Sequence, residues 1–199
     1  RYFYPAVRHL LLDERQNLPA QAGTQIVRAD RRILYRLNNA TPRIYFSRRG
    51  AFYSSQEKAL KAVEDGKVDF SNYDLIEIDG TPPQFYPPET GEEAEITSLK
   101  PSEVIVRTKT FGPRLLVLTD SFESNWTCRI DGENETTIYP VNIAFRAVQV
   151  PAGEHGVAFT YEPRSFYVGA IITLATLAAL FMVAILRNFR RVRPDRLGS

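Results

Sequence analysis

The amino-acid sequence predicts a mainly β protein: a jelly-roll-like β-sandwich, a small α+β segment before it, and one membrane-spanning helix after it. Three observations lead to this prediction. Short β-type runs alternate with turn residues over the second half of the 199 residues, and one uncharged apolar run follows them near the C-terminus. One amphipathic helical pattern interrupts the strand-like runs of the first half.

The sandwich is expected over residues 96–162. Asp131-Gly132, directly after Trp126–Ile130, is a strong signal for a two-residue hairpin turn, and residues 151–154 predict a second turn. Short strands at this spacing are typical of a β-sandwich of about 70 residues. The expected strands lie near residues 94–99, 103–109, 114–119, 126–130, 135–139, 143–150 and 155–162.

Residues 1–80 are interpreted as a small α+β extracytoplasmic subdomain. Its helix is expected to begin after a cap at Ser54 or Ser55 and to end at Gly66, because apolar side chains recur there with helical spacing. Its strands are expected near residues 33–37, 43–47 and 73–78.

Residues 81–95 are rich in proline and glutamate, which predicts a linker between two domains. Proline cannot donate a backbone hydrogen bond, and clustered carboxylates favour exposure to water. The residues concerned are Pro82, Pro83, Pro87, Pro88, Glu89, Glu92, Glu93 and Glu95.

The apolar run Ser165–Leu186 contains no charged residue and predicts a transmembrane helix within residues 163–187. A helix of this length spans about 33 Å, enough for a hydrocarbon core of about 30 Å. Aromatic residues precede the run and arginines follow it. Since positive residues concentrate on the cytoplasmic side, we expect residues 188–199 in the cytoplasm and residues 1–162 outside a bacterial cytoplasmic membrane. The arginines are Arg187, Arg190, Arg191, Arg193 and Arg196.

The charge balance excludes an obvious nucleic-acid partner. The formal net charge is +2, and the five arginines with Asp195 give the tail +4, so the remainder carries −2. A nucleic-acid-binding domain would instead show a basic face. Cys128 is the only cysteine, so no internal disulfide can form, which fits a bacterial envelope protein better than a eukaryotic secreted one.

Small residues on the apolar run favour packing against further membrane helices. Gly169 and Thr173 are four residues apart, as are Ala175 and Ala179, a spacing that lets two helices approach closely. The chain opens at Arg1 without an apolar leader, so export would depend on a cleaved signal or on earlier helices. We therefore expect upstream transmembrane helices of a multi-pass protein.

No catalytic motif is visible, and we expect no cofactor, no metal site and no catalytic residue in this chain. Trp126 is the lone tryptophan and lies near Asp120 and Asp131; it would either fill the sandwich core or stack against a sugar. Arg146 would be either a buried arginine paired with a carboxylate or a surface residue. The candidate binding residues are therefore Trp126, Asp120, Asp131 and Arg146.

An ordered set of motifs resembles the last soluble domain of the YfhO-type bacterial membrane proteins. The resemblance spans about residues 33–186, and it departs from the family pattern at Ser124-Asn125, where glycine usually precedes the tryptophan, and at Cys128. The motifs are Leu115-Leu116-Val117-Leu118-Thr119-Asp120-Ser121-Phe122, Trp126, Ile130-Asp131-Gly132, Asn142, Ala144-Phe145-Arg146-Ala147-Val148, Val150-Pro151-Ala152-Gly153-Glu154-His155, Tyr161-Glu162-Pro163, and, upstream, Leu37-Asn38, Pro42-Arg43-Ile44-Tyr45-Phe46 and Val68-Asp69-Phe70.

The resemblance implies a parent protein that is a multi-pass, GT-C-like glycosyltransferase. Such enzymes transfer sugar from a polyprenyl-phosphate donor to an envelope glycan or a teichoic-acid-type polymer, with catalytic carboxylates in early outer loops. This chain would then supply an accessory domain and the final helix, with the lipid bilayer, upstream helices and a polyprenyl-phosphate sugar or envelope glycan as partners.

The alternative is a non-enzymatic, membrane-anchored module that binds envelope carbohydrate or protein. The gene sequence upstream discriminates the two, since the transferase requires many further hydrophobic helices and the module only a signal peptide.

The expected topology can be tested by cysteine accessibility, because Cys128 is the only native thiol to remove. In a Cys128→Ser background, Ser98→Cys should react with a membrane-impermeant thiol reagent in intact cells. Ser199→Cys should react only after the membrane is permeabilised. Labelling of both positions in intact cells would place the basic tail outside and overturn the assignment.

Overall fold

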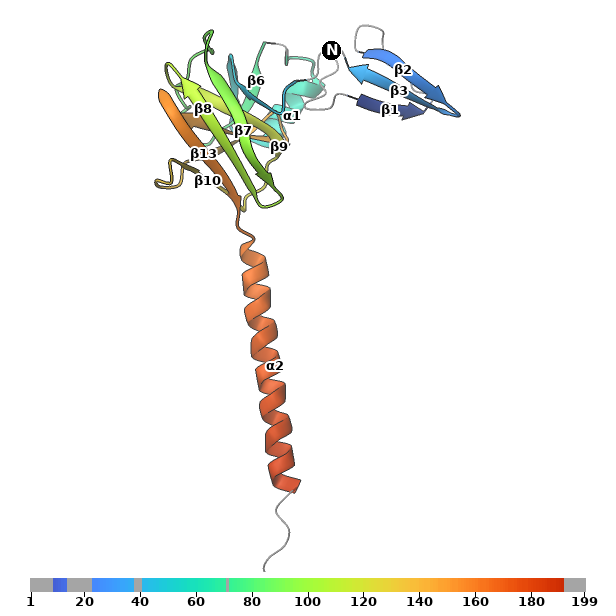
Figure 1. Cartoon of the computed structure of the whole chain (residues 1–199), viewed down its shortest axis with the longest axis vertical. Helices are drawn as coiled ribbons and strands as arrows, with labels where there is room; N and C mark the ends of the chain where they lie inside the picture. The colour runs from blue at the N-terminus through green and yellow to red at the C-terminus, as the bar shows by residue number, and fades with distance from the viewer. Residues whose placement is uncertain (1–8, 14–22, 38–40, 71, 192–199) are drawn as a thin grey trace, which may run out of the picture. The chain divides into compact units, whose positions relative to one another are not determined.

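The structure is a computed structural model that describes residues 9–13, 23–37, 41–70 and 72–191. It divides into one unit that runs to Tyr161 and a second that comprises Glu162–Ser199. The first unit contains one helix and thirteen strands among its described residues (Figure 1). They are β1 (His9–Asp13), β2 (Gly23–Ala29), β3 (Arg32–Leu37), β4 (Ile44–Phe46), β5 (Gly50–Tyr53), α1 (Gln56–Glu64), β6 (Asp74–Glu77), β7 (Glu93–Lys100), β8 (Glu103–Thr110), β9 (Arg114–Ser121), β10 (Trp126–Ile130), β11 (Ile138–Val141), β12 (Phe145–Val150) and β13 (Gly153–Tyr161).

Two of the three sheets pack face to face as a β-sandwich, which confirms the predicted mainly β class. One has four antiparallel strands in the order β10-β13-β8-β7, and the other has six strands in the order β4-β9-β12-β11-β6-β5. In the six-stranded sheet only β5 and β6 pair in parallel. A third sheet, β1-β3-β2, is a separate antiparallel meander.

The main core lies between the two sandwich sheets. Val106 on β8, Cys128 on β10 and Phe159 on β13 face Leu116 on β9 and Val148 on β12, and all five are fully buried. Alternate residues of a strand point to the same face, so Leu115 and Val117 of β9 point the opposite way. They belong to a second cluster with Ile76, Val141 and Ala147. Because β9 is buried on both faces, its sequence is a continuous apolar run rather than an alternating one.

All seven strands expected over the second half are present, with the fifth displaced from residues 135–139 to Ile138–Val141. The predicted helix is α1, whose Ser55 cap accepts a hydrogen bond from the backbone N–H of Lys58. It buries Ala59 and Ala62, small residues that allow close packing.

The expected boundary between an N-terminal subdomain and the sandwich differs from the structure. Strands β4, β5 and β6 belong to the same six-stranded sheet as β9, β11 and β12. β4 pairs with β9 at Tyr45↔Val117, and β6 pairs with β11 at Val141↔Ile76. Hydrophobic periodicity reports which residues form strands but not which distant strand each will pair with, so the sequence did not reveal this sheet.

The predicted turn at Asp131-Gly132 is present, but it does not lead into a regular hairpin. Both residues have positive φ, 53° and 76°, and the N–H of Glu133 donates to the carbonyl of Ile130 at 3.0 Å. Only one bridge, Arg129↔Glu135, follows the turn. β10 instead pairs with β13, while β11 joins the opposite sheet.

Residues 81–95 are not a free linker, because their carboxylates hold a buried arginine. The side chains of Arg114 and Glu92 are 1% and 0% exposed, and Arg114 Nε lies 2.7 Å from Glu92 Oε2. Glu92 also accepts from the N–H groups of Phe111 and Glu89. Burial opposes ionisation of this carboxyl, but these hydrogen bonds outweigh it and lower the pKa of Glu92 below its usual range.

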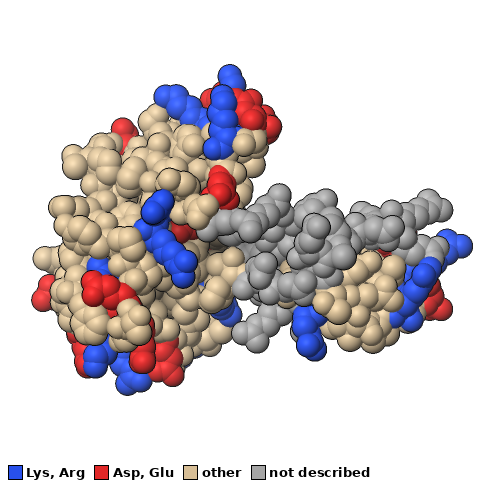
Figure 2. Space-filling model, turned by 90° about the horizontal axis from the view of Figure 1, so that it is seen from above, with Lys and Arg blue, Asp and Glu red and all other residues tan. Residues whose placement is uncertain are grey.

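Ion pairs on the sandwich surface are exposed and contribute little stability. Arg107–Glu95 and Lys109–Glu154 link neighbouring strands at 2.8 and 3.2 Å, and all four side chains are more than half exposed. On the face drawn in Figure 2, acidic and basic groups lie beside one another. Exposed pairs contribute about 0–1 kcal/mol each, so the buried pairs dominate the electrostatics of the fold.

The second unit is the helix α2 (Arg164–Arg191), which contains the one span among the described residues long and apolar enough to cross a membrane, Ser165–Arg187. Its threonine hydroxyls are satisfied within the helix, since Thr173 and Thr176 donate to the carbonyls of Gly169 and Ile172 at 2.9 and 2.8 Å. The described residues therefore contain a β-sandwich and one helix suited to membrane association.

Glu92→Ala should lower the free energy of unfolding by about 3–5 kcal/mol, because it leaves the charge of Arg114 buried without its nearest carboxylate. Denaturant titration of the full chain in detergent, followed by circular dichroism, measures this change. The pKa of Glu92 is about 4.5 in the unfolded chain and lower in the folded protein. The stability that its ionised carboxylate contributes is therefore fully present above about pH 4.5 and is lost as the pH falls through the folded-state pKa. Wild-type stability should therefore fall below about pH 4.5 more steeply than that of Glu92→Ala. Equal stability of the two proteins at pH 7 would refute a structural role for Glu92.

Candidate binding pocket

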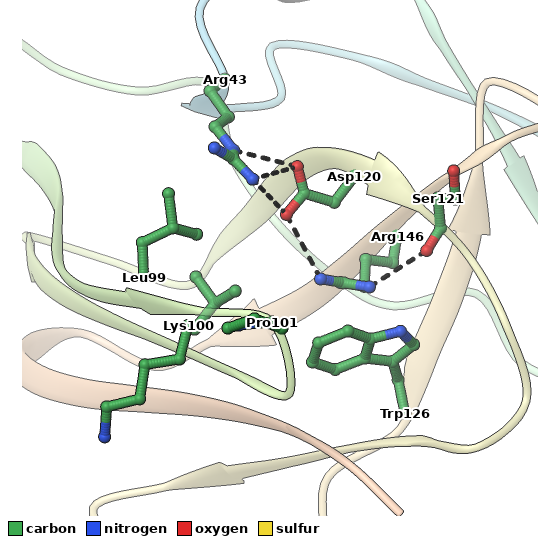
Figure 3. A pocket seen from close by; sticks show the side chains of 9 residues that line it. Arg43, Leu99, Lys100, Pro101, Asp120, Ser121, Trp126 and Arg146 are labelled. Atoms are coloured by element: carbon green, nitrogen blue, oxygen red, sulfur yellow. Dashed lines mark hydrogen bonds and ion pairs between the residues drawn. The ribbon is translucent and has the colours of Figure 1, made fainter. Parts of the chain in front are cut away.

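An open pocket of about 450 Å³ lies at one end of the sandwich and collects three of the four predicted site residues (Figure 3). Trp126 comes from β10, Asp120 from β9 and Arg146 from β12. The turn between β7 and β8 forms another wall. The complete lining is Arg43, Leu99, Lys100, Pro101, Val104, Asp120, Ser121, Trp126 and Arg146.

Arg146 faces the interior of the sandwich. It stands two residues before Val148 and four before Val150, which both point into the core, so the alternation of β12 directs it to the same face. Its side chain is 1% exposed. Of the two alternatives for Arg146, the structure supports the buried arginine paired with a carboxylate.

Groups from both sheets of the sandwich surround the guanidinium of Arg146. It donates to the carbonyl of Ser121 at 3.0 Å and to Asp120 Oδ2 at 3.5 Å, and it lies 3.8 Å from the centroid of the Trp126 ring. Phe159 approaches at 5.4 Å. Its buried Nε is left with no hydrogen-bond partner among the described residues.

Burial lowers the pKa of Arg146 to about 10. Asp120 opposes this effect by favouring the charged form, whereas the nearby charge of Arg43 adds to it. Arg146 is therefore charged at neutral pH, and it is a cation held in a mostly apolar environment.

Arg43 completes the pocket, and the sequence reasoning did not select it. Its Nε and Nη2 donate to the two oxygens of Asp120 at 2.9 and 3.0 Å, a bidentate arrangement (Figure 3). Asp120 thus bridges an exposed and a buried arginine, and the three groups carry a net charge of +1. Arg43 precedes β4, which lies far from Asp120 in sequence, so only the pairing of β4 with β9 reveals the contact.

The ring of Trp126 is largely occupied by protein contacts. The Arg146 guanidinium stacks on it, Tyr161 packs against it with ring centroids 5.3 Å apart, and the residue borders the main core. Little of the ring is free to stack against a sugar. The contacts support the core interpretation of Trp126, with the remaining surface of the ring forming a wall of the pocket.

Asp131 does not join this pocket. Its carboxylate lies 2.6 Å from His155 Nδ1 and accepts from the N–H of Gly156 at 2.7 Å. The hydrogen bonds with His155 and Gly156 lower the pKa of Asp131. The hydrogen bonds with Asp131 and with the carbonyl of Ala152 raise the pKa of His155. The geometry is that of a residue that fixes a turn against β13; a ligand contact for Asp131 stays a prediction.

Among the described residues, no three His, Cys, Asp or Glu side chains gather as a metal site requires. The thiol of Cys128 is fully buried, and burial raises its pKa to about 12, so it is protonated at neutral pH. Cys128 therefore has the environment of a small core residue.

Comparison with protein-family models, with curated proteins and with solved structures finds no match to this chain. The resemblance to YfhO-type proteins therefore stays a prediction that rests on the motifs alone.

Trp126→Ala should lower the free energy of unfolding by about 3 kcal/mol, the lower end for truncation of a buried aromatic, because the ring is only partly buried. It also removes the surface on which the charged Arg146 lies. Trp126→Phe is the matched control, and its loss of unfolding free energy should be less than half of the loss in Trp126→Ala. Denaturant unfolding of the full chain in detergent provides the measurement. An unchanged midpoint for Trp126→Ala would show that the ring does not support the sandwich.

Proposed function

We propose that this chain is the non-catalytic, extracytoplasmic accessory domain and final membrane helix of a multi-pass glycosyltransferase that uses a polyprenyl-phosphate-linked sugar. In this proposal the pocket formed by Arg43, Asp120, Trp126 and Arg146 holds the phosphate of the lipid-linked donor. The observation that carries it is a net cationic pocket whose residue Trp126 pairs with Tyr161, the last residue of the strand that precedes α2.

The donors in the pocket suit a phosphate oxygen. Arg43 is 43% exposed, and only its Nε and Nη2 are used by Asp120, which leaves Nη1 without a hydrogen bond to a described residue. A guanidinium presents a planar set of donors that matches phosphate, and its exposed position makes the approach of an anion feasible. Arg146 adds a fixed positive charge at the back of the pocket.

Covalent connection keeps this pocket near the start of α2. Trp126 pairs with Tyr161 in the sheet, and the N–H of Tyr161 donates to the carbonyl of Ser102 in the β7–β8 turn at 2.9 Å. Arg164, where α2 begins, is three residues later. An extended chain spans at most about 3.6 Å per residue, so Tyr161 lies within about 11 Å of Arg164 at any angle between the two units. If α2 crosses the membrane, as proposed, its first residues lie near the surface where lipid phosphates are found.

The wider assignment draws on the sequence. The arginine tail supports an extracytoplasmic position for the sandwich, and the resemblance to YfhO-type proteins supports a GT-C-like parent whose catalytic carboxylates lie outside this chain. Lipid-linked sugars carry a phosphate at the membrane surface, which is the chemistry that the pocket fits.

Farnesyl phosphate should change the fluorescence of Trp126, the sole tryptophan, when it is added to the full chain in phosphatidylcholine nanodiscs. The response should be saturable, and farnesol should not produce it, because the phosphate is the recognised group. Arg43→Gln should weaken binding about tenfold or more, since a hydrogen bond to a charged group contributes about 1.5–3 kcal/mol.

Arg129→Gln is the matched control, because Arg129 is exposed and lies outside the pocket. Inorganic phosphate, tested alone, separates general anion binding from recognition of a lipid phosphate. Equal responses to farnesol and farnesyl phosphate, or an unchanged affinity in Arg43→Gln, would overturn the proposal.

A further inference from the structure

A second pocket of about 420 Å³ shares no lining residue with the first. It lies beside β4 and the start of β6, two strands that the sheet separates by three others. The side chains that matter here are Tyr45, Arg48, Phe70, Asn72, Tyr73 and Asp74.

Asp74 is a buried carboxylate that is not paired with a cation. It is 9% exposed, and its Oδ1 accepts from the Tyr45 hydroxyl at 2.6 Å and from Asn142 Nδ2 at 2.7 Å. No lysine or arginine of the described residues forms an ion pair with it, and Oδ2 receives no hydrogen bond from them. A buried carboxylate normally uses both oxygens, so Oδ2 is an acceptor available to a ligand in the pocket.

The partners of Asp74 are fixed in the roles of donors. Burial, followed by the charge of Asp74, raises the pKa of Tyr45, so the phenol remains protonated. Asn142 is held in turn by the N–H of Leu75, which donates to its Oδ1 at 2.8 Å. Asn142 and Ile143 both have positive φ, 51° and 73°, and a β-branched residue rarely adopts this conformation. Such strain is maintained only where the surroundings impose it, so the carboxylate is preorganised.

Aromatic and amide groups complete the wall. Tyr73 is 41% exposed, and Phe70 also lines the cavity. The Nδ2 of Asn72 donates to Asp69 at 2.6 Å, which directs its amide and leaves Oδ1 as an acceptor. An aromatic surface beside a carboxylate and an amide can bind a ring that is apolar on its faces and carries hydroxyl groups at its edge.

The lining of the cavity holds one carboxylate, Asp74, and one guanidinium, that of Arg48, so its formal charge is zero. An anion would meet the charge of Asp74, and a cation would meet that of Arg48, so the lining offers neither ion a net attraction. Hydroxyl groups can donate to Asp74 and accept from Arg48 without carrying charge.

We propose that this second pocket binds an uncharged saccharide ring, with Asp74 accepting from its hydroxyl groups and Tyr73 covering one of its faces. The site is independent of the phosphate pocket, since the two share no lining residue. Arginines outnumber carboxylates in the first lining, whereas the second holds one of each.

Saturation-transfer NMR of the full chain in phosphatidylcholine nanodiscs tests this proposal with methyl glucoside and methyl N-acetylglucosaminide as neutral probes. At least one should show saturable binding. Tyr73→Ala should weaken that binding about fivefold or more, and Asp74→Asn should also weaken it. Glucosamine, an ammonium at pH 7, and glucuronate, a carboxylate, should bind more weakly than the corresponding neutral ring.

Tyr86→Ala is the matched control, because Tyr86 is a 50% exposed tyrosine that does not line the cavity. Arg43→Gln should leave sugar binding unchanged, so failure of the phosphate proposal can be distinguished from failure of this one. Circular dichroism checks that Asp74→Asn is folded, because Asp74 is buried. If that variant unfolds, Tyr73→Ala decides the test, because Tyr73 is exposed. Absence of saturable binding by both neutral sugars, tighter binding of a charged probe, or equal losses in Tyr73→Ala and Tyr86→Ala would overturn the proposal.

Discussion

The burial of the Arg146 guanidinium between the two sheets is the constraint on which the candidate site depends. Removing a charge from water costs several kcal/mol, so neighbouring groups must offset that cost. Asp120, the carbonyl of Ser121 and the Trp126 ring do so, and they come from strands of both sheets. The same contacts bring those three residues to one end of the sandwich. The pocket there is a consequence of satisfying a buried charge.

One of these contacts also involves the strand that precedes α2 in the chain. The ring of Trp126 packs against Arg146 of the opposite sheet, and Trp126 pairs with Tyr161 on the neighbouring strand β13. Tyr161 is the last residue of β13, which α2 follows in the chain. The proposed lipid phosphate suits the excess positive charge of this pocket.

Buried charges are handled differently in three parts of the sandwich. Arg114 has carboxylates from Glu92 and Glu89, so its charge is fully compensated by protein groups. Arg146 shares a single carboxylate with Arg43, which leaves an excess of positive charge. Asp74 has only neutral donors, the hydroxyl of Tyr45 and the amide of Asn142. The first arrangement completes a structural contact, whereas the other two retain capacity for a ligand.

The sequence by itself determined the strands of the second half, the helix α1 and the apolar run Ser165–Leu186, because each follows from local periodicity and turn chemistry. It did not indicate β1, β2 or β5. It also selected Trp126, Asp120 and Arg146 by residue type. Only the tertiary structure decided that β4 and β6 belong to the sandwich sheet. This pairing brings Arg43 into the first pocket and Asp74 into the second. It likewise placed Asp131 with His155 instead of in the pocket. Pairing between strands far apart in sequence depends on how whole faces pack, and no local pattern records that choice.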